Sequence, residues 1–142
     1  QNGTRGLLWA SQVAIGEENG LNIRVYGEKG SLEWHQQEPN TLWVRWLDRP
    51  TEMRRTATDF VGGSAASNSR LPAGHPEGYI EGFANIYSNF ADALSELLTS
   101  GTVNETEFDY PNVYDGVRGM AFIDTVVRSS ASDKKWLEVP VQ

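Results

Sequence analysis

The fold is decided between residues 21 and 36, where the chain reads LNIRVYGEKGSLEWHQ. Apolar and polar residues alternate over 21–26, which is the pattern of a β-strand with one buried face. Gly27–Gly30 is a turn bracketed by two glycines, and residues 31–36 continue as the next strand. These residues predict two consecutive strands of an antiparallel meander.

Strand-like segments continue on both sides of this hairpin. Gly6–Ile15 alternates with apolar groups on both of its faces, so we expect a strand that is covered on both sides. Residues 16–20 supply glycines at both ends of a turn back to 21–26. Thr41–Leu47 predicts a fourth strand, and the more polar Thr51–Thr58 suits the edge of the sheet.

The first helix is predicted after a long loop. Residues 59–74 are rich in Gly, Ser, Ala and Asn, which indicates an exposed loop of the kind that often serves a site. Pro76 is suited to the first turn of a helix. Apolar residues then repeat at helical spacing from Tyr79 to Leu97, and the helix is predicted to end near Gly101.

A second helix and a last strand complete the predicted elements. Asn112, with Asp115 three residues later, is the pattern of a helix N-cap. Trp136–Val141 alternates briefly and predicts a returning strand. Strands followed by helices predict one α+β domain over residues 1–142, an open, largely antiparallel sheet with two main helices packed on one face.

Composition restricts the class of protein. The chain has 142 residues, 39% of them hydrophobic, and a formal net charge of −7, which predicts one soluble domain with a single, aromatic-rich core. The acidic balance argues against nucleic-acid binding, and no apolar run approaches the length of a membrane span. Without cysteine there is no disulfide framework and no thiolate metal site. We therefore expect a cytoplasmic protein without nucleic-acid or membrane partners.

Two further features concern the chain's setting. All five tryptophans lie in strand-like segments, which is more than one sheet face buries beneath two helices, so some are expected at an interface. The chain begins with Gln1, and a strand pattern starts within six residues. We therefore expect a piece of a longer protein.

Three motifs in order carry a family resemblance: YGEKGSLEW at 26–34, LPAGHPEGY at 71–79 and DGVRGMAFI at 115–123. Together they resemble the C-terminal domain of the Gfo/Idh/MocA oxidoreductases. In that family an N-terminal Rossmann domain binds NAD or NADP, and a lysine there takes part in catalysis. The chain has no GxGxxG after a strand, since Gly3, Gly6 and Gly16 have the wrong spacing and no following helix.

The resemblance implies the substrate-side and oligomerisation domain of an NAD(P)-dependent dehydrogenase acting on a sugar, a polyol or a related hydroxylated compound. NAD or NADP belongs to the full-length parent, so we expect this chain to bind no cofactor and to be inert alone. It also implies a small-molecule substrate for the full-length enzyme. The partner it implies is a second copy of the chain, bound through the open sheet face.

Two residues are predicted to bind substrate. His75, at a junction of loop and helix, can meet a substrate hydroxyl with a pKa near neutrality. Tyr79, one helical turn further on, can direct its hydroxyl to the same cleft. The alternatives are a helix-entry role for His75 and a core position for Tyr79. No catalytic, cofactor-binding or metal-binding residue is assigned.

Other polar residues have structural explanations. Glu77 in a first helical turn is favoured by the helix dipole, and Arg118 is expected to pair with Asp115 or Asp124 on its own helix. Only two histidines are present, His35 and His75, and their separation gives no zinc-ligand spacing.

Two other function classes stay open from the residues alone. A free-standing carbohydrate-binding module would stack exposed tryptophans on sugar rings. A small glycosidase would use a pair of carboxylates about 5 to 10 Å apart, a distance that sequence does not give.

Overall fold

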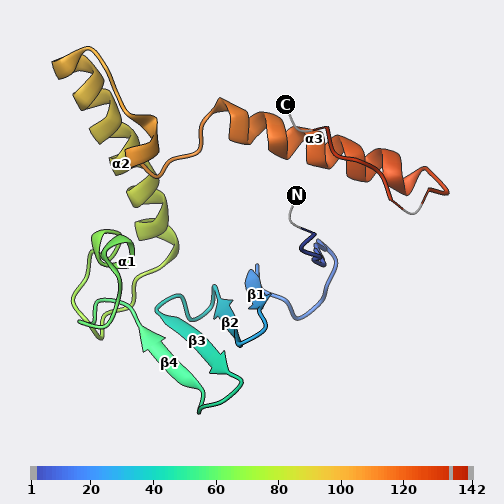
Figure 1. The fold of residues 1–142 in the computed structure, drawn as a ribbon, viewed down its shortest axis with the longest axis horizontal. Helices are drawn as coiled ribbons and strands as arrows, with labels where there is room; N and C mark the ends of the chain where they lie inside the picture. Colours follow the sequence, from blue (N-terminus) through green and yellow to red (C-terminus); the bar gives the residue numbers. More distant parts are fainter. Residues whose placement is uncertain (1–2, 135, 141–142) are drawn as a thin grey trace. The chain divides into compact units, whose positions relative to one another are not determined.

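The computed structural model describes residues 3–134 and 136–140. The chain divides into two compact units, Gln1–Tyr79 and Ile80–Gln142. The first unit contains the sheet and a short helix, and the second contains most of one long helix and all of another (Figure 1). The predicted α+β class is confirmed, whereas the packing of both helices on one sheet face stays a prediction.

The sheet is a four-stranded antiparallel meander in the order β1-β2-β3-β4. Its strands are β1 (Asn22–Tyr26), β2 (Gly30–His35), β3 (Thr41–Trp46) and β4 (Glu52–Arg55). Each of these strands coincides with a segment that was predicted to be a strand, and the polar β4 lies at the edge of the sheet as expected. The Gly27–Gly30 turn is closed by a 2.8 Å hydrogen bond from the Gly27 N–H to the Gly30 carbonyl.

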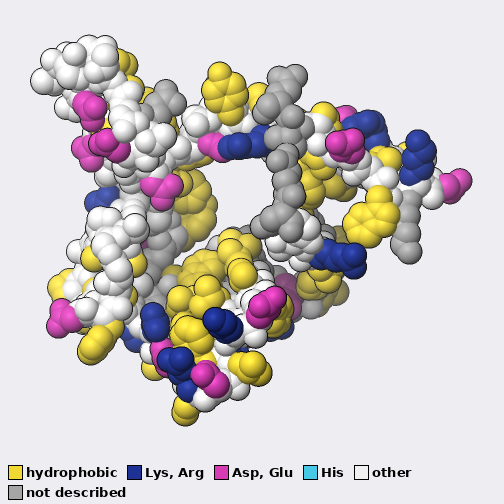
Figure 2. Space-filling view, in the orientation of Figure 1, with side chains coloured by type: hydrophobic (Ala, Val, Ile, Leu, Met, Phe, Trp, Pro, Cys, Tyr) yellow, Lys and Arg dark blue, Asp and Glu magenta, His cyan; other side chains and the backbone are white. Residues whose placement is uncertain are grey.

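The strand register sorts the side chains onto two different faces, because residues paired across strands lie on the same side of a sheet. One, here called the apolar face, carries Ile23, Val25, Leu32, Trp34, Leu42, Val44 and Trp46. The other, the polar face, carries Asn22, Arg24, Tyr26, Ser31, Glu33, His35, Thr41, Trp43 and Arg45. Figure 2 shows hydrophobic side chains at the surface over the sheet.

Two predicted strands are wrong for the described residues. Gly6–Ile15 forms no strand, and its apolar side chains are exposed, Leu7 to 96% and Ile15 to 104%. A strand with apolar groups on both faces needs other elements packed against each face. The exposure of these side chains shows that no described element covers this segment. Residues 136–140 also form no strand, while Val141 lies outside the described residues.

The two long helices are α2 (Tyr79–Ser100) and α3 (Val113–Ser130). The predicted cap of α3 is confirmed as a capping box: the Asn112 side chain accepts from the backbone of Asp115, whose carboxylate accepts from the Asn112 N–H. No described helix is long and apolar enough to cross a membrane.

The start of α2 and the loop before it differ from the prediction. The helix begins at Tyr79, three residues after Pro76, because side-chain bonds hold the preceding residues in a loop. The Gly- and Ser-rich loop contains a five-residue helix, α1 (Gly63–Ser67), whose residues are all exposed. A one-turn helix, η1 (Glu105–Glu107), follows α2.

The predicted single, aromatic-rich core is wrong for the described residues. The buried hydrophobic residues are Val44 at 5% exposure and Ala93 at 3%, one in each unit, and neither is aromatic. Trp34, Trp43 and Trp46 are half-buried. Among the described residues of the first unit the strands contact chiefly one another, which agrees with the partial exposure of these tryptophans.

Gly30 is where the sheet tolerates no side chain. A Cβ on Gly30 would lie 2.5 Å from the Arg45 carbonyl oxygen and 3.2 Å from the Trp46 ring. We expect Gly30→Ala to lower the free energy of unfolding by about 1 to 3 kcal/mol, measured by urea denaturation of the chain. Gly82→Ala in α2, where a Cβ meets nothing within 4 Å, is the control and should stabilise by up to about 1 kcal/mol. Equal stability of the Gly30 variant and wild type would contradict the close approach.

Candidate functional site

His75 lies in a tight turn of the loop before α2. The His75 N–H donates to the Pro72 carbonyl at 3.2 Å, which closes a four-residue turn. Gly74, at the third position, has φ of +88°, a left-handed conformation that favours glycine. The order Pro72-Ala73-Gly74-His75 therefore dictates the turn that presents the histidine.

The His75 ring is exposed and has a defined orientation. Its Nδ1 lies 3.1 Å from the Pro72 carbonyl oxygen. Since a carbonyl oxygen only accepts hydrogen bonds, Nδ1 carries the hydrogen. In the neutral ring Nε2 then bears the lone pair, and among the described residues it has no hydrogen-bond partner. The loop thus presents Nε2 as an acceptor for a hydroxyl group.

Glu77 has a structural role that differs from the predicted one. Because α2 begins at Tyr79, Glu77 lies outside the first helical turn, and the dipole explanation is wrong. Its two carboxylate oxygens accept from the backbone N–H groups of Arg70, at 2.6 Å, and Leu71, at 3.0 Å. Glu77 therefore joins the two ends of the loop that contains His75.

Tyr79, the other predicted substrate residue, is the first residue of α2 and is 66% exposed. An exposed phenol at the end of the His75 loop leaves substrate contact open, so both site residues stay predictions. Two hollows are described on the sheet, one at the Gly27–Gly30 turn and one at Arg24 and Arg45. Neither is lined by His75 or Tyr79.

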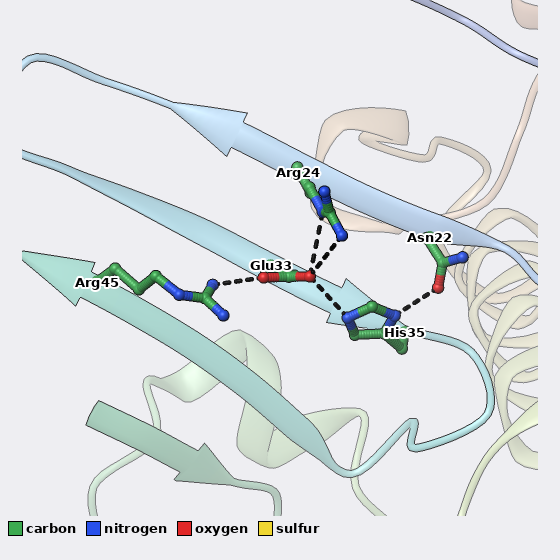
Figure 3. Close-up of polar contacts among 5 residues, drawn as sticks. All are labelled: Asn22, Arg24, Glu33, His35 and Arg45. Carbon is green, nitrogen blue, oxygen red and sulfur yellow. Dashed lines mark hydrogen bonds and ion pairs between the residues drawn. The ribbon is translucent and has the colours of Figure 1, made fainter. Parts of the chain in front are cut away.

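The polar face carries a second cluster of chemistry-bearing side chains (Figure 3). Glu33 of β2 pairs with Arg24 of β1 at 3.0 Å and with Arg45 of β3 at 2.5 Å. Its Oε1 also lies 2.8 Å from Nε2 of His35, whose Nδ1 lies 2.6 Å from the Asn22 side-chain oxygen. One carboxylate thus links three strands, and strand alternation is the sole sequence pattern that indicates this cluster.

The surroundings of Glu33 lower the pKa of its carboxyl below the ordinary value of 4.5. Partial desolvation alone would raise this pKa, but the hydrogen bond from His35 and the charges of Arg24 and Arg45 outweigh it. The pKa of Glu52 is lowered by hydrogen bonds from Arg54 and Trp46, and that of Asp115 by bonds from the Asn112 backbone and Arg118.

A pKa lowered in the folded state stabilises the fold above the unfolded pKa and loses that effect as pH falls. We therefore expect the urea midpoint of the chain to fall between about pH 5 and about pH 3, and Glu33→Gln to flatten this dependence. Glu28→Gln, which removes an exposed carboxylate of the Gly27–Gly30 turn, is the control. An unchanged slope in the Glu33 variant would show that its ion pairs do not persist in solution.

Two further polar groups can be compared with the sequence expectations. Arg118 pairs with Asp115 one turn away on α3, as expected. Among residues 3–134 and 136–140, no group of three or more His, Asp or Glu side chains has the arrangement of a metal site.

The described residues do not fit a dinucleotide cofactor. Such a site needs parallel strands joined by a crossover helix, with a glycine-rich turn opening that helix on the pyrophosphate. Here each pair of neighbouring strands is antiparallel. Gly62 is the N-cap of α1 and Gly63 is its first residue, but α1 has five residues and all four strands of the described sheet precede it in the chain.

Known proteins resemble this chain over nearly its whole length. Residues 1–139 match the family described as the oxidoreductase family, C-terminal alpha/beta domain. The uncharacterized oxidoreductase YfiI of Bacillus subtilis (strain 168) is 30% identical over 138 residues, which are 97% of this chain and 35% of YfiI.

The chain is also similar to solved structures of oxidoreductases. An oxidoreductase from Sinorhizobium meliloti is 48% identical with a TM-score of 0.79, covering 90% of this chain and 35% of that one. An inositol dehydrogenase homolog from Azotobacter vinelandii, complexed with NADH and myo-inositol, is 30% identical with a TM-score of 0.85, covering 92% of this chain and 34% of that one. The chain spans about a third of the length of these relatives. It belongs to the Gfo/Idh/MocA oxidoreductase family and corresponds to the C-terminal alpha/beta domain of that family.

Proposed function

We propose that the chain is the substrate-side and oligomerisation domain of an NAD(P)-dependent dehydrogenase that acts on a sugar, a polyol or a related hydroxylated compound. The observation that carries this proposal is the similarity to the Azotobacter vinelandii homolog, whose complex contains NADH and myo-inositol. The cofactor chemistry belongs to the part of the enzyme outside this chain, since the antiparallel meander does not fit a dinucleotide.

His75 is the residue proposed to contact the substrate. In its Nδ1–H form the ring accepts a hydrogen bond at Nε2, and a polyol offers hydroxyl donors. Tyr79 offers a phenol that both donates and accepts. Two such groups near each other in sequence suit a ligand with several hydroxyls, whose orientation depends on more than one polar contact.

The test of the proposed activity is NADH formation by the full-length oxidoreductase that contains this chain, with myo-inositol, other polyols and sugars as substrates. We expect saturable reduction of NAD or NADP with at least one of these compounds. Absence of turnover with every hydroxylated compound, in an enzyme that binds its cofactor, would contradict the proposal.

Self-association is proposed to use the polar face. The seven-residue apolar face is suited to cover by the protein's own helices, which leaves the polar face and Trp43 for a second copy. The register confirms that Trp43 and Trp46 lie on opposite faces. Trp46 is already engaged, since its Nε1 donates to Glu52 at 2.8 Å and Arg49 lies 4.7 Å from its ring.

We expect sedimentation equilibrium of the chain at micromolar concentration to show a dimer or larger species. Trp43→Glu should dissociate it while the circular dichroism spectrum stays that of wild type, because a buried unpaired charge disfavours the interface. Trp46→Glu, the matched change on the other face, should instead destabilise the subunit. A monomer at all concentrations would refute the interface.

A carbohydrate-binding module remains the second candidate, because Trp9 is 73% exposed and Trp136 is 83% exposed. Exposed indoles stack on sugar rings. Binding of a glycan by the chain alone, abolished by Trp9→Ala or Trp136→Ala, would favour this candidate over the dehydrogenase domain.

A further inference from the structure

The loop that presents His75 is closed by a single carboxylate. Both oxygens of Glu77 accept hydrogen bonds from consecutive backbone N–H groups, those of Arg70 at 2.6 Å and Leu71 at 3.0 Å. Hydrogen bonds to an ionised acceptor are stronger than neutral ones. Residues 70 to 77 therefore form a ring, and the turn with His75 lies inside it.

Asn40 fastens this ring to the sheet. Its side-chain Nδ2 donates to the His75 carbonyl at 2.7 Å, and its Oδ1 accepts from the Glu77 N–H at 3.2 Å. The residue is 8% exposed and directly precedes β3, where its own carbonyl accepts from the Thr56 N–H at 3.1 Å. Both polar atoms of the Asn40 side-chain amide therefore form hydrogen bonds to the segment that contains His75.

The backbone of His75 is therefore held by hydrogen bonds at both its N–H and its carbonyl group. Its N–H is bound within the turn to Pro72, and its carbonyl is bound by Asn40. The same Pro72 carbonyl accepts from Nδ1 of the ring, so the position of the turn and the tautomer of the ring depend on each other. A looser loop would lose that bond and free the imidazole to change tautomer.

We propose that Asn40 and Glu77 are positioning residues for His75: they hold the 70–77 loop so that the ring presents Nε2 as the acceptor for a substrate hydroxyl. The proposal rests on the function proposed above for His75. Asn40 and Glu77 act through His75 and need not touch the substrate.

Two isosteric variants of the full-length oxidoreductase test it. Glu77→Gln places an NH₂ group against one backbone N–H and so breaks one of the two loop bonds. Asn40→Asp places an oxygen against the His75 carbonyl and leaves the bond to the Glu77 N–H in place. Glu28→Gln, at an exposed glutamate far from the loop in sequence, is the matched control.

We expect each variant to lower kcat/KM for the hydroxylated substrate about tenfold, with the KM for the cofactor unchanged and Glu28→Gln like wild type. On a His75→Ala background, neither variant should cause a further loss, because the group they position is gone. Kinetics like the control, or the same loss with and without His75, would overturn the positioning role.

The tautomer of His75 gives a readout that is independent of turnover. Nitrogen NMR of the wild-type enzyme should show the Nδ1–H form, and Glu77→Gln should shift the population toward Nε2–H. A predominant Nε2–H form in the wild type would overturn the proposal. If His75→Ala alone leaves the kinetics unchanged while the Nδ1–H form is seen, the substrate role proposed for His75 is refuted. The finding that Asn40 and Glu77 hold the 70–77 loop is then unaffected.

Discussion

The isolated chain is expected to bind neither NAD nor NADP and to oxidise no polyol. The full-length oxidoreductase should bind one of these cofactors and oxidise a hydroxylated substrate. The expected difference is a complete loss of activity. A dinucleotide is held by a glycine-rich turn and helix N-terminus between parallel strands, and the described sheet is antiparallel throughout.

Isothermal titration calorimetry of the chain with each dinucleotide is the measurement. We expect no saturable heat at millimolar cofactor, and the full-length enzyme under the same conditions is the positive control. Micromolar affinity of the chain for either dinucleotide would contradict this account and would direct attention to Gly62 and Gly63 at the start of α1.

The second large effect is expected from His75→Ala in the full-length enzyme. Loss of the Nε2 acceptor should lower kcat/KM for the hydroxylated substrate at least about tenfold, which corresponds to about 1.4 kcal/mol of transition-state binding. The KM for the cofactor should be unchanged, because the described antiparallel sheet lacks the parallel strands that hold a dinucleotide.

Steady-state kinetics at equal folded fraction check this prediction. The hydrogen bond from Nδ1 to the Pro72 carbonyl shows that His75 also stabilises the turn in which it lies. A loss of protein stability in the variant therefore has to be separated from a loss of substrate binding. A correctly folded variant with wild-type kinetics would leave His75 only the helix-entry role.

Local patterns were sufficient to predict much of this structure. The hairpin of β1 and β2 follows from alternation on both sides of the Gly27–Gly30 turn. The N-terminus of α3 follows from Asn112 and Asp115, because a capping box is contained within four residues. Such signals depend on neighbours in sequence, so they can be recognised without the rest of the fold.

Gly6–Ile15 shows where alternation fails. The period of two is the same whether or not a strand finds partners, and nothing in those residues states which layers cover them. The start of α2 was misplaced for a related reason, since Pro76 is compatible with a first helical turn but Glu77 is bound back to Arg70 and Leu71.

The residue that sequence reasoning missed at the site is Asn40. Its partners are 35 and 37 residues away, at His75 and Glu77, and an asparagine after Glu38 and Pro39 has the appearance of an ordinary turn residue. Only the folded chain brings this amide to the loop.

The central claim, that this chain supplies the substrate side of the enzyme, is tested most directly by a crystal structure of the full-length oxidoreductase with cofactor and a bound polyol. We predict that Nε2 of His75 lies within about 3.2 Å of a substrate hydroxyl. A polyol bound entirely by residues outside this chain, in an enzyme that turns that polyol over, would contradict the account.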